Sequence, residues 1–112
     1  MNNRRLSDDA LELVAGRFRL LADSTRLKIL HALEMGEMNV TELVEATQAG
    51  QANVSKHLAS LLSGGIVTRR KEGLNAIYRV TDESIFDLCD TVCSGLKTQF
   101  ETRQTALAKI FN

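Results

Sequence analysis

The chain has 112 residues, of which 44% are hydrophobic and 25% charged, and its formal net charge is zero. These values are typical of one soluble globular domain, and no apolar run approaches the roughly 18 residues that cross a bilayer. The opening segment MNNRRLSDDALEL lacks the apolar stretch of a signal peptide. We therefore predict a single domain over residues 1–112 and a cytoplasmic location, where cysteines stay reduced.

Two helices are predicted in the first third of the chain. Apolar residues recur at helical spacing over residues 8–21, and Ser7 or Asp8 stands where a helix cap is expected. The segment TRLKILHAL, residues 25–33, predicts a second helix, and Gly36 is expected to end it in a left-handed conformation.

A short helix, a tight turn and a longer helix follow over about residues 40–63. The short helix is expected from Thr41 to about Thr47, and the segment QAGQ forms the turn. In the segment ANVSKHLASLLSG, one valine and three leucines lie on one face of the longer helix, which a pair of glycines ends. A helix-turn-helix with glycine in its turn is a DNA-binding motif.

The sequence pattern then changes from helical to β-structure. The segments IVTRRKE and AIYRVT, within about residues 66–80, contain β-branched and aromatic residues and flank a Gly-Leu-Asn turn. They predict a β-hairpin. Helices followed by a helix-turn-helix and a hairpin form a winged helix, so the predicted fold is mainly α with a β-hairpin wing.

A long final helix is predicted over about residues 82–110, with Thr81 or Asp82 as its cap. Its apolar stripe comprises Ile85, Leu88, Cys89, Val92, Leu96, Phe100, Leu107 and Ile110. A domain this small cannot cover a stripe of that length with its own core. The stripe therefore predicts a partner helix, most simply from a second copy of the chain.

The charges are unevenly distributed, although they cancel over the whole chain. Residues 51–80 hold five basic residues and one acidic residue, whereas the segments on either side have more acidic than basic residues. A local basic segment with acidic flanks is the pattern of a surface that contacts a phosphate backbone. A solvated basic face is the alternative interpretation.

The predicted helix-turn-helix and wing offer side chains suited to DNA. The start of the second motif helix carries polar groups that reach base edges in the major groove, namely Gln51, Asn53, Ser55 and Lys56. The wing carries cations suited to phosphates or to the minor groove, namely Arg69, Arg70, Lys71 and Arg79.

The chain resembles the ArsR/SmtB family of winged-helix repressors. The resemblance rests on LADSTRLKILHAL, on NVSKHLASLLSGGIVTRRKEG and on YRVT before the last helix, and it covers nearly the whole sequence. It implies a homodimer built on the first and last helices, about residues 8–21 and 82–110. Such a dimer is expected to bind a palindromic operator in double-stranded DNA and to release it when an inducer is sensed.

The resemblance also bears on individual residues. It implies that Ser55 and Lys56 face DNA, with Gln51 and Asn53 nearby. His57 is interpreted as a packed helix residue in preference to a metal ligand. Arg26 has two open interpretations, which are a phosphate contact and a solvated position on the second helix.

The better-known metal sites of such repressors are not present in this sequence. The zinc-type site requires Asp-x-His and a distant His-x-x-Glu, but Asp82 is followed by Ser84, and Gly95 and Thr98 occupy the later positions. The arsenite-type site requires closely spaced cysteines in the third helix, and VTELVEAT has none. No cofactor is therefore predicted to be required.

The only two cysteines, Cys89 and Cys93, lie four residues apart on the final helix. This spacing places them on one helix face about one turn apart, which disfavours an intrahelical disulfide. They either pack as small apolar residues at the dimer seam or hold a thiophilic inducer between two thiolates. A disulfide between subunits, or a bridge of more than two sulfurs, stays open.

Among thiophilic inducers, a trivalent arsenical that already carries one organic group is the first choice, because it needs only two sulfurs. A soft metal ion such as lead or cadmium is the alternative, because a dimer pools four cysteines. Sensing of oxidants or persulfides by the same cysteines, or a signal that uses no thiol, also stays open.

Two other classes of protein are alternatives to a DNA-binding regulator. An enzyme is disfavoured because the cysteines are not in a C-x-x-C motif and no Gly-rich phosphate loop is present. A winged helix used only for protein contacts would not need basic residues concentrated on the motif helix and the wing.

Overall fold

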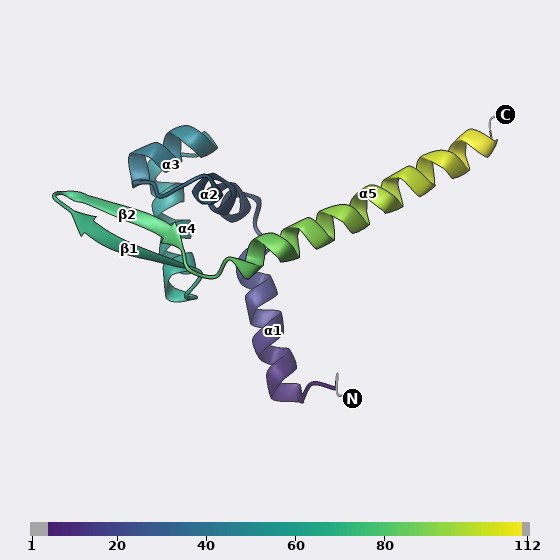
Figure 1. Ribbon diagram of the computed structural model, residues 1–112, viewed down its shortest axis with the longest axis horizontal. Coiled ribbons are helices and arrows are strands. Elements are labelled where there is room, and N and C mark those ends of the chain that lie inside the picture. The colour runs from purple at the N-terminus through teal and green to yellow at the C-terminus, as the bar shows by residue number, and fades with distance from the viewer. Residues whose placement is uncertain (1–4, 111–112) are drawn as a thin grey trace. The chain divides into compact units, whose positions relative to one another are not determined.

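The computed structural model describes residues 5–110 and confirms the winged helix-turn-helix, which is mainly α with one antiparallel hairpin (Figure 1). Its elements in chain order are α1 (Asp8–Leu21), α2 (Ser24–Glu34), α3 (Val40–Thr47), α4 (Gln51–Ser63), β1 (Val67–Glu72), β2 (Asn75–Val80) and α5 (Ser84–Ile110). The chain divides into two compact units, Met1–Thr81 and Asp82–Asn112. The predicted single domain includes residues 1–4 and 111–112, which lie outside the described part, and its extent stays a prediction.

Side-chain caps explain where α1 and α3 begin. The Oγ of Ser7 accepts a hydrogen bond from the amide of Ala10 at 3.1 Å. Of the two predicted caps of α1, Ser7 or Asp8, the structure therefore has Ser7. At the start of α3, Asn39 and Glu42 form a capping box, in which each side chain accepts a hydrogen bond from the other residue's amide. This box starts α3 at Val40, one residue before the predicted start.

Two residues with positive φ end the second and third helices. Gly36 follows the C-cap of α2 with a φ of 151°, a conformation that glycine adopts without strain. Gln48 ends α3 with a φ of 59°, in the left-handed conformation. Its side chain donates a hydrogen bond to the carbonyl of Glu45 at 2.7 Å, which compensates part of the cost of this backbone conformation.

The hydrophobic core joins α2, α3, α4 and the base of the hairpin. Its fully or almost fully buried side chains are Ile29, Leu30, Leu33, Leu43, Val54, Leu58, Leu61, Ile66, Val67 and Tyr78. Each aliphatic side chain of this kind contributes roughly 1.5–3 kcal/mol through its burial. Because the core takes one face of α4, the opposite face of that helix is left to solvent.

The hairpin pairs β1 with β2 from Val67↔Val80 at its base to Glu72↔Asn75 at its tip. Gly73 and Leu74 form the turn, and Gly73 has a φ of 64°, so Asn75 belongs to the strand and not to the predicted turn. A bridge between Met38 and Tyr78 adds the loop before α3 to the same sheet edge. The base of the wing is thereby held against the helix-turn-helix.

Thr81 joins the end of the wing to the end of α4. Its Oγ1 lies 2.9 Å from the carbonyl oxygen of Gly65 and 3.0 Å from that of Ile66, so its single proton is shared between the two. The predicted role of Thr81 as a cap of the last helix is therefore wrong, because its hydroxyl is engaged at the hairpin. Asp82, the other predicted cap, accepts a hydrogen bond from the amide of Ser84 at 3.2 Å.

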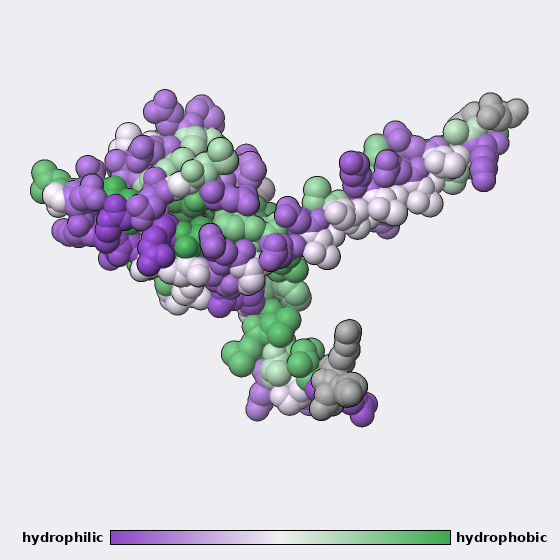
Figure 2. Space-filling view, viewed as in Figure 1, coloured by the Kyte–Doolittle hydropathy of each residue, from purple (hydrophilic) through white to green (hydrophobic). Residues whose placement is uncertain are grey.

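Two helices, α1 and α5, each have several exposed large apolar residues. On α1 these are Leu11, Leu13, Val14 and Phe18, and Figure 2 shows the green apolar atoms that gather on this helix. On α5 they are Val92, Leu96, Phe100, Leu107 and Ile110. No helix within residues 5–110 is long and apolar enough to span a membrane.

Candidate nucleic-acid interface and cysteine pair

α4 buries aliphatic side chains on one side and exposes polar side chains near its start. The core takes Val54, Leu58 and Leu61, all with 0% exposure, because they recur at helical spacing. The polar side chains near the start of the helix are all exposed, namely Gln51, Asn53, Ser55 and Lys56. They offer amide, hydroxyl and ammonium groups to a partner in the major groove.

The turn before α4 leaves the start of this helix open. Gly50 is the N-cap and provides no side chain that could accept from the first amides. The preceding Thr47 is buried and turns inward, with its Oγ1 donating to the carbonyl of Leu43 at 2.7 Å. The first turn of α4 therefore has amides that no side-chain cap engages, beside the predicted DNA-facing residues.

His57 lies on the inner face of α4 and is only 6% exposed. Its Nδ1 accepts a hydrogen bond from Nε of Arg26 at 2.9 Å, and its Nε2 lies 3.7 Å from Oδ1 of Asp23. His57 is thus packed, in agreement with its preferred interpretation. The side chain of Arg26 is engaged within the protein: its Nε donates to His57, and its Nη1 donates to the carbonyl of Leu20 at 3.1 Å. It is therefore neither simply solvated nor wholly available for a phosphate contact.

Asp23 is the N-cap of α2 and the charged end of this cluster. Its Oδ1 accepts a hydrogen bond from the amide of Arg26 at 3.0 Å. That bond is the main reason that the pKa of Asp23 lies below its ordinary value, and the nearby His57 and the amide of Thr25 act in the same direction. The sequence signal for the cluster is the segment DSTR, in which a capping residue precedes an arginine by three positions.

The four predicted cations of the wing are all exposed, but they are not equivalent. Because side chains alternate along a strand, Arg69 and Lys71 share one face, and Arg70 lies on the other. Arg79 pairs with Thr68 and so shares the face of Arg70. Nη1 of Arg69 donates to the hydroxyl of Tyr78 at 3.4 Å, a long hydrogen bond.

Arg70 is held by two carboxylates. Its Nη1 forms an ion pair with Glu37, in the loop before α3, and its Nη2 lies 2.9 Å from Oε2 of Glu72. These two partners raise the pKa of Arg70 above its ordinary value. Sequence reasoning missed Glu37, because nothing in the chain order indicates that the loop reaches the wing. Arg70 is therefore a weaker candidate for a phosphate contact than Lys71 or Arg79.

Cys89 and Cys93 lie one turn apart near the start of α5, and no disulfide joins them. Cys89 is partly buried and Cys93 is exposed. By helical spacing, Cys89 lies within the apolar stripe of α5 and Cys93 at its edge. Their side chains are therefore presented on one face of the helix, with Asp90 beside them in the sequence.

Within residues 5–110, no three His, Cys, Asp or Glu side chains gather into a group that could hold a metal ion. Asp82, Ser84, Gly95 and Thr98, at the zinc-type positions, therefore form no such group. Two thiols can still bind a centre that needs only two donors.

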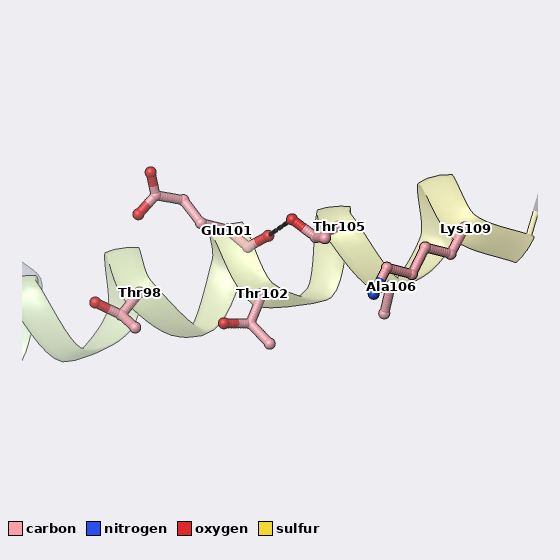
Figure 3. A pocket seen from close by; sticks show the side chains of 6 residues that line it. All are labelled: Thr98, Glu101, Thr102, Thr105, Ala106 and Lys109. Atoms are coloured by element: carbon pink, nitrogen blue, oxygen red, sulfur yellow. Dashed lines mark hydrogen bonds between the residues drawn. The ribbon is translucent and has the colours of Figure 1, made fainter.

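A hollow on α5 is lined by residues of this helix alone. Figure 3 shows its six side chains, which are Thr98, Glu101, Thr102, Thr105, Ala106 and Lys109. The hydroxyl of Thr105 donates a hydrogen bond to the carbonyl of Glu101 at 3.0 Å, so the helix backbone already engages it. By helical spacing, Thr98, Glu101 and Thr105 lie opposite the apolar stripe. The hollow lies on a helix face away from the cysteines and from the apolar stripe.

Comparison with known proteins gives a consistent result. Residues 23–69 match the model of the family described as bacterial regulatory protein, arsR family. The HTH-type transcriptional regulator KmtR of Mycobacterium tuberculosis is 40% identical over 83 residues, which cover 74% of this chain and 64% of KmtR. The chain thus spans a little under two thirds of the length of this relative.

Two solved structures extend the similarity to most of the fold. The homodimeric winged helix-turn-helix DNA-binding domain of Mb0332 from Mycobacterium bovis has a TM-score of 0.72 at 32% identity, with 88% of this chain and 94% of that chain covered. The AntR antimony-specific transcriptional repressor has a TM-score of 0.77 at 27% identity, with 90% and 93% covered.

Proposed function

The chain belongs to the ArsR family of bacterial regulatory proteins, and on that premise we propose that it is a homodimeric transcriptional repressor that binds a palindromic operator. We propose further that a thiophilic inducer binds Cys89 and Cys93 and causes release of the operator. The family consists of DNA-binding regulators, so the chain is not an enzyme, as the sequence predicted.

The observation that carries the DNA-binding proposal is the two-sided character of α4. The side chains that face the core are aliphatic and fully buried, whereas Asn53, Ser55 and Lys56 are exposed on the other face. The wing adjoins this helix in sequence and adds Lys71 and Arg79, both exposed. A polar helix face with flanking cations suits base edges in the major groove and the phosphates beside it.

The exposed apolar residues of α1 and α5 support the homodimer. Phe18 is 51% exposed and Phe100 is 60% exposed, and each lies on an apolar helix face. A second copy of the chain would remove both faces from water through a two-fold symmetric interface. A two-fold dimer also presents two copies of α4 to two half-sites about one helical turn of DNA apart, which is why the operator is proposed to be palindromic.

The cysteine pair supports a thiophilic inducer. Two thiols one helical turn apart can each form a bond to one large, soft atom. A trivalent arsenical with one organic group fits this pair, because each As–S bond forms as a hydroxyl on arsenic leaves with the thiol proton as water. AntR is an antimony-specific repressor, and antimony shares its thiophilic chemistry with arsenic. A soft metal ion is the alternative inducer.

The proposed mechanism is a shift between two dimer arrangements. An inducer on α5 changes the packing of the dimer helices and therefore the separation of the two copies of α4. Release of DNA requires that the inducer bind the non-binding arrangement more tightly, since only differential affinity shifts such an equilibrium.

Electrophoretic mobility shift on the promoter of its own operon tests the DNA-binding proposal. Binding should weaken steeply between 50 and 200 mM salt, because phosphate contacts release counterions. Lys56→Ala should lower affinity by about tenfold, whereas Lys97→Ala, at an exposed position on α5, should not. Equal effects of the two substitutions would contradict the assignment of α4 as the DNA-facing helix.

Operator release in the presence of phenylarsenous acid tests the inducer. Cys89→Ser and Cys93→Ser, alone and together, should bind the operator like the unmodified chain but fail to release it. A relocated thiol provides the control: Cys93→Ser combined with Ser94→Cys rotates one sulfur about 100° around the helix and should not restore release. Normal release by the double serine variant would exclude the cysteine pair as the sensor.

A further inference from the structure

Arg26 connects three helices of the unit Met1–Thr81. Its amide donates to the side chain of Asp23 at the start of α2, its Nη1 donates to the carbonyl of Leu20 in the last turn of α1, and its Nε donates to His57 on α4. The guanidinium has donors that point in different directions, so one side chain can engage both neighbouring helices at once.

The hydrogen bond from Arg26 fixes the tautomer of the neutral His57 imidazole. Because Nδ1 accepts the hydrogen bond from Arg26, the proton of the neutral ring resides on Nε2, which faces Asp23 at 3.7 Å. His57 is 6% exposed, so loss of this bond would leave a polar atom in the interior without its partner. The link between α2 and α4 is therefore costly to break.

A second contact fixes α1 near the other end of α4. Nη2 of Arg17 donates to the carbonyl of Gly64, the C-cap of α4, at 3.2 Å. A Cβ atom added at Gly64 would lie 2.2 Å from Cδ2 of Leu20, which shows how closely the two helices approach there. α1 thus holds α4 at its end directly and at its middle through Arg26.

From these contacts we propose that Arg26 is a positioning residue that transmits the orientation of α1 to the DNA-facing helix α4 through His57. α1 is a helix of the proposed dimer interface, and this inference rests on the proposed function for that assignment. A change in dimer packing that tilts α1 then moves α4 with it. Arg26 acts without touching DNA.

A matched pair of substitutions at His57 tests the link. His57→Asn places an amide oxygen near the position of Nδ1 and keeps the acceptor for Arg26. His57→Gln places its amide near the position of Nε2 and loses that acceptor. Both introduce a buried amide, so a general cost of polar burial affects both, whereas loss of the link affects only His57→Gln.

Amide hydrogen exchange in the DNA-free protein is the first measurement. His57→Gln should raise exchange in the last turn of α1 by about tenfold, and His57→Asn should leave it within about threefold of the unmodified chain. Equal exchange in the two variants would overturn the inference. This measurement does not depend on operator binding, so it separates failure of the inference from failure of the proposed function.

Operator binding is the second measurement. His57→Gln should weaken binding by about tenfold and His57→Asn by less than about threefold. Arg26→Lys should weaken binding while the slope of log affinity against log salt stays the same. A slope reduced by about one would instead make Arg26 a phosphate contact and overturn the inference.

Discussion

The winged unit and α5 use similar apolar residues in opposite ways. In the unit that ends at Thr81, Ile29, Leu43 and Leu58 are all fully buried among their neighbours in the chain. In α5, Ile85 is buried, but Leu96 and Phe100 are each 60% exposed. The core of the winged unit is therefore complete within one chain, whereas α5, like α1, carries an apolar face that a partner would cover.

This difference separates two kinds of stability. Substitutions in the core of the winged unit should lower the free energy of unfolding of each chain. Substitutions on the stripe of α5 should act on self-association and leave the isolated chain almost unchanged. Four predictions test this separation, beginning with the substitution that should have the largest effect.

Leu58→Ala should lower the free energy of unfolding by about 3 kcal/mol, because it removes a fully buried side chain from the centre of α4 and leaves a cavity. Urea denaturation monitored by circular dichroism measures the change. Leu96→Ala is the matched control, since it removes the same atoms from an exposed position. At protein concentrations where the chain is monomeric, the control should change the free energy by less than about 0.5 kcal/mol.

Phe100→Ala should weaken dimerisation by about thirtyfold, which corresponds to about 2 kcal/mol for a central aromatic residue of an interface. Sedimentation equilibrium measures the dissociation constant. Thr105→Ala, on the opposite face of α5, should leave it unchanged. An equal loss with both substitutions would mean that the apolar stripe is not the dimer surface.

Asn39→Ala should lower the free energy of unfolding by about 1 kcal/mol, because it removes the capping box at the start of α3. Thermal unfolding measures the loss. Asn39→Asp is the control, since aspartate caps a helix equally well and should retain nearly the full stability. The effect belongs to the winged unit, so it should not alter dimerisation beyond the change in folded fraction.

The smallest effect should be the dependence of stability on pH at Asp23. Its folded pKa is depressed, so its contribution is present above the ordinary value of 3.8 and is lost as the pH falls through the lower folded pKa. Asp23→Asn keeps a capping side chain but removes this titration. Denaturation between pH 2 and 5 should therefore show a shallower acid loss for the variant than for the unmodified chain.

Local sequence signals predicted most of the winged unit. The periodicity of α1 and α4, the cap at Ser7 and the alternation in the hairpin all act over a few residues, so they can be identified without tertiary contacts. The polar face of α4 followed from the same periodicity, because its buried positions also determine its exposed positions.

Contacts between distant segments were not predictable in this way. Glu37 reaches Arg70 across 33 positions, and Arg26 reaches His57 across 31. Both arginines have the basic side chain expected of a DNA contact, but their partners lie in other elements. Thr81 shows the same limit, since its hydroxyl bonds to Gly65 and Ile66 instead of capping the next helix.

The anchoring of the hairpin has a consequence for its length. Met38 and Thr81 fix its base, whereas Leu74 at the tip is fully exposed. Pairs of residues inserted at the tip would extend the two strands by about 3.4 Å for each added pair without disturbing the hydrophobic core. The length of the wing is therefore a property that evolution or design can adjust independently of folding.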